Sequence, residues 1–316
     1  MIRLSEGTSA CLGLKATRMD TYPSTAYLLS GDKCSMSCSF CPRGSGNYNN
    51  RLGRVGWPEY TEEEVAKGLV SLPQGRLQRL CLQAVRGESG IEPIIRTIDI
   101  LKKVSHLPIS LSAWVDNREE AGALLQAGAE RISIALDAAT DAVYARVKGG
   151  VFNERLGLLL SCADAWPGRF TTHLICGLGE NEEDLLSLID SLIRAGVRVA
   201  LFSFTPLRGT LMEDRPQPKL ESYRRVQAGF YLLRDNAVSL SALSFKDGKL
   251  LSFGLSRLEL EKQLTGGKAF ETTGCSGCNR PYYNERPQGP LYNYHRPLSP
   301  SEAEKEIGIL LRSIEG

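Results

Sequence analysis

The 316-residue sequence lacks the features that place a protein in a membrane or send it across one. It has no run of 18 apolar residues, which a membrane-spanning helix requires, and its first residues show no signal-peptide pattern. We therefore expect a cytoplasmic protein with no membrane partner.

The sequence also lacks a large excess of charge of either sign. Its 38 basic and 36 acidic residues leave a net charge of +2, which gives no reason to expect a nucleic acid partner. No low-complexity segment and no repeat beyond the β–α unit is apparent. With 42% hydrophobic residues, the chain is long enough to bury one large α/β core.

Nine cysteines occur without an export signal, so we expect metal or redox chemistry rather than a disulfide framework. The most informative are Cys34, Cys38 and Cys41, whose C-x3-C-x2-C spacing places three thiolates on one loop. Three thiolates can hold three irons of a [4Fe–4S] cluster and leave the fourth iron open to a small molecule. The alternatives are buried structural cysteines or half of a zinc site. Zinc sites usually pair two C-x2-C-like hairpins, and no matching His/Cys pair follows closely.

Strand-like and helix-like segments alternate along most of the chain. The predicted strands span residues 26–30, 77–85, 109–115, 131–136, 169–176 and 197–205. The predicted helices span residues 60–72, 93–104, 118–127, 153–166, 182–195 and 220–235. Six such steps predict right-handed crossovers and a parallel sheet. The fold class is therefore α/β, a partial (β/α)6 TIM barrel.

The barrel is expected to span residues 24–235, between an N-terminal extension, 1–23, and a C-terminal extension, 236–316. The C-terminal extension predicts a hairpin within 236–254, a loop over 264–300 and a helix over 302–314. Barrel enzymes place their chemistry at the C-terminal ends of the strands. The cysteine loop, Glu88, Asp137 and the turn at residues 177–180 all fall at such ends.

The cysteine spacing is that of the radical S-adenosylmethionine (SAM) enzymes, and the chain resembles them, biotin synthase in particular. The resemblance implies that the open iron binds the amino and carboxylate groups of SAM and that Phe40 lies against the adenine. It also places the turn of Gly177, Gly179 and Glu180 beside the adenine. Glycines there let the backbone approach a ligand, although a simple strand–helix turn is the alternative.

Three further residues acquire expected roles from the same resemblance. Asp137 would accept hydrogen bonds from the ribose hydroxyls, unless it caps a helix. Arg155 would hold the SAM carboxylate by bidentate pairing, unless it is a surface helix residue. Glu88 would bind the methionine amino group, although the preceding residues are Arg-Gly where the family often has Gly-Gly. Reductive cleavage of SAM would then yield methionine and a 5′-deoxyadenosyl radical, and the protein would position it and exclude water.

The remaining cysteines divide into two groups. Cys81, Cys162 and Cys176 lie in apolar segments, where a small buried hydrophobic residue is expected. Cys275 and Cys278 form a C-x2-C pair in a glycine-rich loop, followed by Asn-Arg-Pro-Tyr-Tyr-Asn-Glu-Arg-Pro. A lone zinc ion or free thiols are the alternatives to a cluster there.

This tail block resembles the two-component lipoyl synthases of archaea and some anaerobic bacteria. Single-chain lipoyl synthases hold an auxiliary [4Fe–4S] cluster, consumed as the sulfur source, with three cysteines and a serine from an Arg-Ser sequence. The resemblance implies the ligand set Cys11, Cys275, Cys278 and Ser313, although Cys11 does not follow the compact cysteine motif of the single-chain enzymes. A serine alkoxide suits iron less than thiolate does, so it can be displaced during sulfur transfer.

The expected activity is a radical SAM sulfurtransferase that inserts sulfur into an octanoyl chain on a carrier lysine, with Cys34, Cys38, Cys41 and Ser313 catalytic. The expected partners are an octanoylated carrier protein or peptide, a second radical SAM protein, and an electron donor such as ferredoxin or flavodoxin. One rival is a biotin synthase-like methyltransferase or lyase with a structural tail. The other is a non-enzymatic iron–sulfur scaffold.

Overall fold

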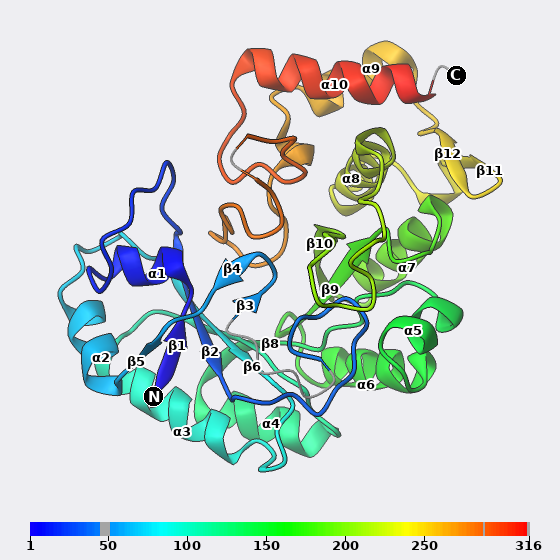
Figure 1. Ribbon diagram of the computed structural model, residues 1–316. Helices are drawn as coiled ribbons and strands as arrows, with labels where there is room; N and C mark the ends of the chain where they lie inside the picture. The colour runs from blue at the N-terminus through cyan, green and yellow to red at the C-terminus, as the bar shows by residue number, and fades with distance from the viewer. Residues whose placement is uncertain (45–50, 287, 315–316) are drawn as a thin grey trace.

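The computed structural model describes residues 1–44, 51–286 and 288–314. At its centre is an eight-stranded sheet in the order β10-β9-β8-β7-β6-β2-β1-β5 (Figure 1). Its parallel strands are β2 (Thr25–Ser30), β6 (Arg79–Ala84), β7 (Ile109–Ser112), β8 (Ala129–Ser133), β9 (Phe170–Cys176) and β10 (Arg198–Ser203). The sheet is open, with β10 and β5 at its edges. This confirms the predicted α/β fold and partial barrel.

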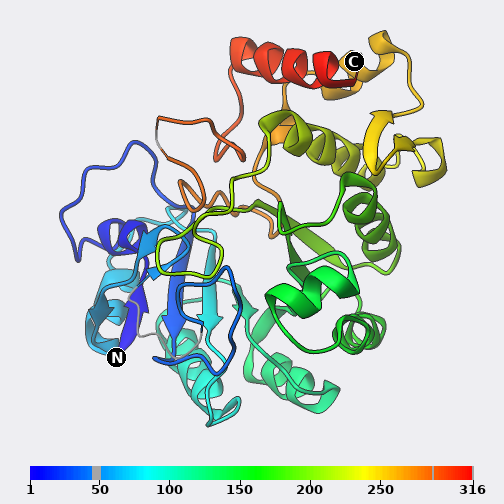
Figure 2. The same ribbon diagram turned by 45° about the vertical axis from the view of Figure 1, so that its right-hand side comes forward.

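Helices follow the parallel strands and lie on the outer side of the sheet (Figures 1 and 2). They are α2 (Glu62–Val70), α3 (Glu92–Val104), α4 (Arg118–Ala127), α5 (Asp141–Val147), α6 (Phe152–Ala165), α7 (Glu182–Arg194) and α8 (Leu220–Arg234). Capping boxes at Thr61 and Asn181 fix the starts of α2 and α7, because each box satisfies backbone N–H groups of the first turn. Gly128, at a φ of 122°, ends α4 as predicted.

Successive side chains along each strand face opposite sides of the sheet, which gives the barrel an outer and an inner layer of side chains. In β6, Leu80 and Leu82 join the large apolar cluster beneath the helices. Cys81 lies between them in the sequence and instead packs with Tyr27 and Trp57, which form a separate cluster on the inner face. Because side chains of a strand alternate between faces, the barrel has an apolar outer layer and a more polar interior.

The N-terminal extension completes one edge of the sheet. Strand β1 (Ile2–Leu4) pairs antiparallel with β2, and β5 (Glu59–Tyr60) pairs antiparallel with β1. Buried Arg3 forms ion pairs with Asp32 and Glu59. The sequence did not predict these strands, because two or three residues carry no readable periodicity. It also missed helix α1 (Glu6–Cys11), helix α5 and the hairpin of β3 (Arg51–Leu52) and β4 (Val55–Gly56).

The C-terminal extension follows α8. It begins with the predicted hairpin, β11 (Ser244–Lys246) and β12 (Lys249–Ser252), continues through an unpredicted helix α9 (Arg257–Leu264), and ends in α10 (Pro300–Ile314). Short 3-10 turns occur at Leu240–Ala242 and Lys268–Phe270. Helix α10 packs along α8, where fully buried Arg224 pairs with Glu306 at 2.7 Å. No helix in the described ranges is both long enough and apolar enough to cross a membrane.

Candidate functional site

The first cysteine loop begins directly after β2, at the carboxyl end of the parallel sheet. Hydrogen bonds from Ser35 N to Arg86 O (2.8 Å) and from Ser39 N to Val147 O (2.7 Å) hold it against β6 and α5. Buried Arg43 closes the loop on its own start, because its guanidinium donates to the carbonyls of Gly31 and Asp32. The loop is thus fixed at both ends, as a multidentate ligand loop requires.

All three thiols of this loop are partly exposed. Burial raises the pKa of Cys38 to about 12, against the opposing effect of Lys148. Burial also raises the pKa of Cys41, and Cys34 contributes as a neighbouring charge. A metal that binds such thiols stabilises their thiolate form.

Asp137 lies four residues beyond β8, in an isolated bridge to Leu174, with a φ of 64°, a left-handed conformation that few non-glycine residues adopt. Its carboxylate accepts a hydrogen bond from buried Lys148 at 2.8 Å. Burial alone would lower the pKa of Lys148, but Asp137 and Cys38 outweigh burial and raise it. The helix-cap alternative for Asp137 is wrong, because Thr140 caps α5. Lys148, which sequence reasoning missed, therefore forms an ion pair with Asp137 and interacts electrostatically with Cys38 of the cysteine loop.

The turn after β9 has the backbone geometry that glycines permit. Gly177 and Gly179 have φ angles of 108° and 140°. Two arginines hold the turn: Arg215 donates to Gly177 O at 2.8 Å, and Arg146 donates to Leu178 O at 3.0 Å. A Cβ added at position 179 would lie 2.1 Å from Arg146 Nη2, so the guanidinium would have to move away from the turn. Sequence reasoning identified the glycines but not the two arginines.

Glu180 completes this turn and is the most unusual carboxylate of the site. Both of its carboxylate oxygens are buried and have no hydrogen-bond partner. Burial raises its pKa to about 7. Buried polar atoms without partners are rare in folded proteins. A ligand with N–H or O–H donors would satisfy these oxygens, as SAM would.

Arg155 does not lie on the surface of α6. Its side chain is buried, donates to Val115 O at 2.5 Å, and stacks over the Trp114 ring with the guanidinium carbon 4.0 Å from the ring centroid. The surface alternative is therefore wrong. Arg86 stacks over the same ring at 4.6 Å, so Trp114, just after β7, contacts one cation that follows β6 and one on α6.

The other residues expected to bind SAM lie at this same end of the sheet. Phe40 is half-buried and packs against the apolar core. Glu88 is exposed in the segment that follows β6. Neither makes a contact that assigns it a role.

The tail crosses the open side of the partial barrel. Thr273 accepts a hydrogen bond from the backbone N–H of Leu201 in β10 at 2.9 Å. Six residues later, Asn279 accepts from Ser24 N at 3.0 Å, just before β2. The loop that carries Cys275 and Cys278 therefore spans the gap between β10 and β2, the two outermost parallel strands.

The two tail cysteines contact side chains of the inner face. Cys275 Sγ lies 3.3 Å from Ser110 Oγ in β7, and Cys278 Sγ lies 3.2 Å from the hydroxyl of Tyr27 in β2. Cys81 packs beside Cys278 in the same inner cluster. The structure confirms buried positions for Cys162 and Cys176, but Cys81 is partly exposed and faces the interior. The alternation of Cys81 with Leu80 and Leu82 is the sequence signal that could have shown this.

The structure does not bring Cys11 or Ser313 to this loop. Cys11 ends α1 and packs against the outer apolar cluster, across the sheet from Tyr27 and Cys278. Ser313 lies on α10, where its hydroxyl donates to Leu310 O at 2.6 Å and its carbonyl faces Arg225. Their predicted partnership with Cys275 and Cys278 depended on resemblance, which gives no distance through the fold.

Among residues 1–44, 51–286 and 288–314, no three His, Cys, Asp or Glu side chains converge as the ligands of one metal ion would. The ligands of a four-iron cluster bind different irons, so they lie farther apart than those of a single zinc ion. The thiol loop after β2, the unpartnered Glu180 and the buried Arg155 supply the ligand, acceptor and donor groups that a cluster with bound SAM would need.

The radical SAM superfamily profile matches residues 28–192, more than half of the chain. Among curated proteins, the chain is 24% identical over 198 residues to an uncharacterized protein of Methanocaldococcus jannaschii, covering 61% of this chain and 52% of that protein. It is 24% identical over 190 residues to GTP 3',8-cyclase of Limosilactobacillus fermentum, covering 58% of this chain and 54% of that enzyme. The chain thus spans about half the length of these relatives.

Solved structures share the fold. The [FeFe]-hydrogenase maturase HydG superposes with a TM-score of 0.55 at 14% identity, over 66% of this chain and 50% of HydG. Streptococcus suis SuiB bound to S-adenosylmethionine superposes with a TM-score of 0.51 at 11% identity, over 71% of this chain and 54% of SuiB.

Proposed function

The chain belongs to the radical SAM superfamily, and we propose that it is a sulfurtransferase that inserts sulfur into an octanoyl chain on a carrier lysine. The family implies a [4Fe–4S] cluster and SAM. In this chain Cys34, Cys38 and Cys41 would hold the cluster, and Glu180 and Arg155 would hold SAM. When bound, the cluster supplies the electron that cleaves SAM to methionine and a 5′-deoxyadenosyl radical.

One observation carries the sulfur-transfer part of this proposal. The tail inserts a second pair of cysteines, Cys275 and Cys278, into the interior of the barrel whose strand ends carry the SAM loop. Tyr283 of the same tail packs in the inner cluster with Cys81 and Cys278, and burial, followed by Cys41 and Cys81, raises its pKa. Such an arrangement suits an enzyme that makes a carbon radical and then supplies it with sulfur.

The chain's own residues would position the reactants and exclude water. Buried Lys148 and Asp137 form one wall beside the cysteine loop, and the tail covers the open side between β10 and β2. A carrier protein, a second radical SAM protein and an electron donor such as ferredoxin or flavodoxin would be partners of this reaction.

The test is an anaerobic assay with the reconstituted full chain, SAM, dithionite and an octanoyl-lysyl peptide, with and without a companion radical SAM protein. We expect 5′-deoxyadenosine together with a peptide that gains sulfur by mass spectrometry. The same peptide without the octanoyl group is the control. 5′-Deoxyadenosine without any sulfur in the peptide would reject sulfur transfer and favour a methyltransferase or lyase. No 5′-deoxyadenosine would count against an enzyme.

A further inference from the structure

A row of inner-face residues runs across four neighbouring strands. Tyr27 of β2 pairs in register with Cys81 of β6, Cys81 with Ser110 of β7, and Ser110 with Arg131 of β8. Tyr27 and Ser110, the residues on either side of Cys81, contact the thiols of Cys278 and Cys275. Cys81 therefore lies between the two strands above which the tail cysteines are held. Three thiols are grouped here from two separate parts of the sequence, β6 and the tail loop.

The two hydroxyls beside these thiols each accept a hydrogen bond from another group. Tyr27 OH accepts from the backbone N–H of Arg280 at 3.0 Å, so its own proton is available to Cys278 Sγ. Ser110 Oγ accepts from Arg79 Nη1 at 2.9 Å, so its proton is available to Cys275 Sγ. Both hydroxyls thus have a proton that they can donate to sulfur, as they would to a thiolate.

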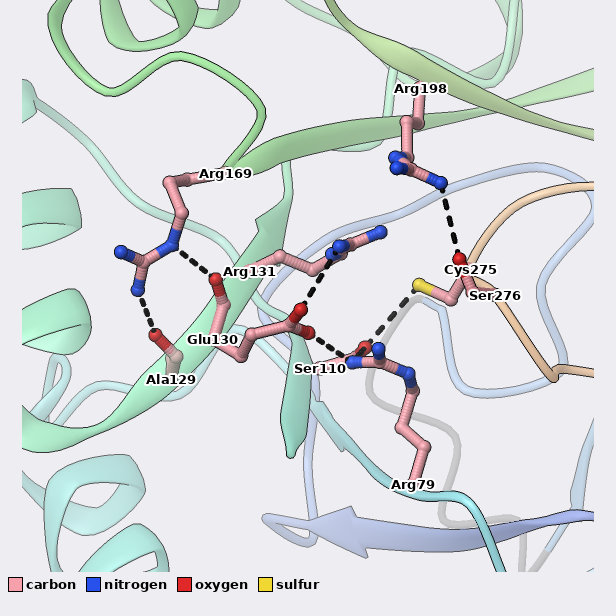
Figure 3. A network of polar contacts seen from close by, with 9 residues as sticks. All are labelled: Arg79, Ser110, Ala129, Glu130, Arg131, Arg169, Arg198, Cys275 and Ser276. Carbon is pink, nitrogen blue, oxygen red and sulfur yellow. Dashed lines mark hydrogen bonds and ion pairs between the residues drawn. The ribbon is translucent and has the colours of Figure 1, made fainter. Parts of the chain in front are cut away.

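The same region contains more buried arginine side chains than its one carboxylate, Glu130, can pair with completely. Glu130 pairs with both Arg79 and Arg131 (Figure 3). Even so, Arg79 Nε, Arg131 Nε and Nη1, and Arg280 Nη1 are buried without a hydrogen-bond acceptor. Figure 3 shows the Arg79 and Arg131 guanidinium groups beside Ser110 and Cys275. Unpartnered buried N–H groups of arginine favour an anionic occupant.

The two tail cysteines also border an open space. Cys81, Cys275 and Cys278 each keep accessible surface, although all three lie against the inner face of the sheet. A cavity of about 850 Å³, bordered by β10, the end of α8 and the tail, is lined by both Cys275 and Cys278. Cys275 and Cys278 therefore border this cavity, whereas Cys81 lies beneath them on the sheet and does not line it.

We propose that Cys81, Cys275 and Cys278 are the thiolate ligands of a second [4Fe–4S] cluster inside the barrel, with the arginine N–H groups facing its sulfides. Three thiolates leave one iron without a cysteine ligand. The inference deepens the proposed sulfur transfer and rests on it only for the cluster's use as a sulfur source. It assigns Cys81 the place that sequence resemblance gave to Cys11 and Ser313.

The test measures iron and sulfide in the full chain after anaerobic reconstitution. The triple variant Cys34→Ala, Cys38→Ala, Cys41→Ala removes the first cluster and isolates the second site. We expect this variant to keep about four irons and four sulfides per chain, with the Mössbauer signature of a [4Fe–4S] cluster. Adding Cys81→Ala is expected to lower the iron to below about one per chain. Retention of about four irons after Cys81→Ala, or zinc without sulfide, would overturn the proposal.

Matched controls separate ligation from folding. Cys162→Ala, a buried cysteine on α6, and Cys11→Ala or Ser313→Ala are expected to leave the iron content of the triple variant unchanged. Loss of iron in Cys11→Ala or Ser313→Ala would support the other ligand set and reject this one. Circular dichroism checks each fold. If Cys81→Ala unfolds the sheet, Cys275→Ala in the tail loop replaces it as the test variant. About four irons retained in the triple variant with Cys275→Ala would also overturn the proposal.

The two proposals can fail separately. A second cluster that forms while the octanoyl peptide gains no sulfur would leave this inference intact and reject the sulfur transfer. Sulfur transfer by a chain that holds only the first cluster would support the proposed function and reject the second cluster.

Discussion

At the scale of single residues, the site is defined by charged groups that the protein buries without complete pairing. Glu180 has no hydrogen-bond partner for either carboxylate oxygen, and Arg155 has a buried Nε without one. Lys148 and Asp137 are paired, yet both are buried beside a loop of thiols. Such groups cost stability in the free protein and are retained where a ligand interacts with them.

Replacing Glu180 with Gln separates its effect on stability from its effect on binding. The folded-state pKa of about 7 lies above the usual value of 4.5, so the folded protein binds more protons than the unfolded chain between these pH values. Glu180 therefore costs stability progressively as the pH rises through this window, up to about 3 kcal/mol above pH 7. We expect Glu180→Gln to be more stable than the wild type at pH 8 and about equally stable at pH 4.

The same variant should bind SAM roughly tenfold to a hundredfold more weakly, because it loses a charged hydrogen-bond acceptor. Denaturation curves at the two pH values and calorimetric titration with SAM measure the two effects. Glu304→Gln, an exposed position on α10, is the control. Unchanged SAM affinity in Glu180→Gln would show that the carboxylate does not face the ligand.

The Lys148–Asp137 pair should behave as one unit. Lys148→Met leaves the Asp137 carboxylate buried without its partner and is expected to cost about 3–5 kcal/mol of unfolding free energy. The double variant Lys148→Met, Asp137→Asn is expected to recover part of this loss. A double-mutant cycle on urea denaturation measures the coupling. Additive losses would mean that the two side chains do not stabilise each other.

At the scale of elements, α10 is held to α8 by one buried ion pair and its neighbours. Arg224 of α8 donates to Glu306 of α10 and to the carbonyls of Leu291 and Tyr292. Tyr294 adds a bond to Glu306 at 2.9 Å. The terminal helix therefore also fixes the tail segment that precedes it.

Removing the carboxylate of Glu306 should loosen this element. Glu306→Ala leaves a fully buried guanidinium unpaired and is expected to cost about 3–5 kcal/mol, whereas Glu306→Gln keeps hydrogen-bond acceptors and should cost less. Limited proteolysis is expected to cut the Glu306→Ala chain within residues 264–300 first. Glu304→Ala, two residues away and exposed, is the control. Equal stability of the Ala and Gln variants would indicate that packing alone holds α10.

At the scale of the whole molecule, the tail closes the open side of the barrel by contacts to β10 and to the segment before β2. A cluster on Cys81, Cys275 and Cys278 would add a covalent connection between the sheet and this tail. Because it binds only the folded chain, it should stabilise the entire fold.

Loading the second cluster should therefore raise the melting temperature. In the Cys34→Ala, Cys38→Ala, Cys41→Ala background we expect an increase of roughly 5 °C or more on reconstitution. Adding Cys278→Ala should remove the increase, whereas Cys162→Ala should keep it. Anaerobic differential scanning calorimetry makes the comparison. An equal increase with and without Cys278 would place the stabilising iron elsewhere.

Much of this molecule follows from its sequence alone. Hydrophobic alternation and glycine stops predicted the six β–α steps, because long periodic elements reflect burial of one face. The spacing of Cys34, Cys38 and Cys41 predicted the first cluster loop, because neighbours on one loop are neighbours in space. Elements of two or three residues, such as β1 and β5, escaped prediction because they are stabilised by pairing and not by local pattern.

What only the tertiary structure decided is which distant residues meet. The sequence determined that Cys275 and Cys278 form a pair, but not that the pair enters the barrel or that Cys81 lies between their strands. Nor could it show that Lys148 pairs with Asp137 or that Arg155 points inward. These contacts join positions far apart in the chain, and they depend on how the sheet curves and where the tail crosses it. The spacing of residues in the sequence thus predicts a ligand loop, whereas the packing of the chain determines which distant residues complete a site.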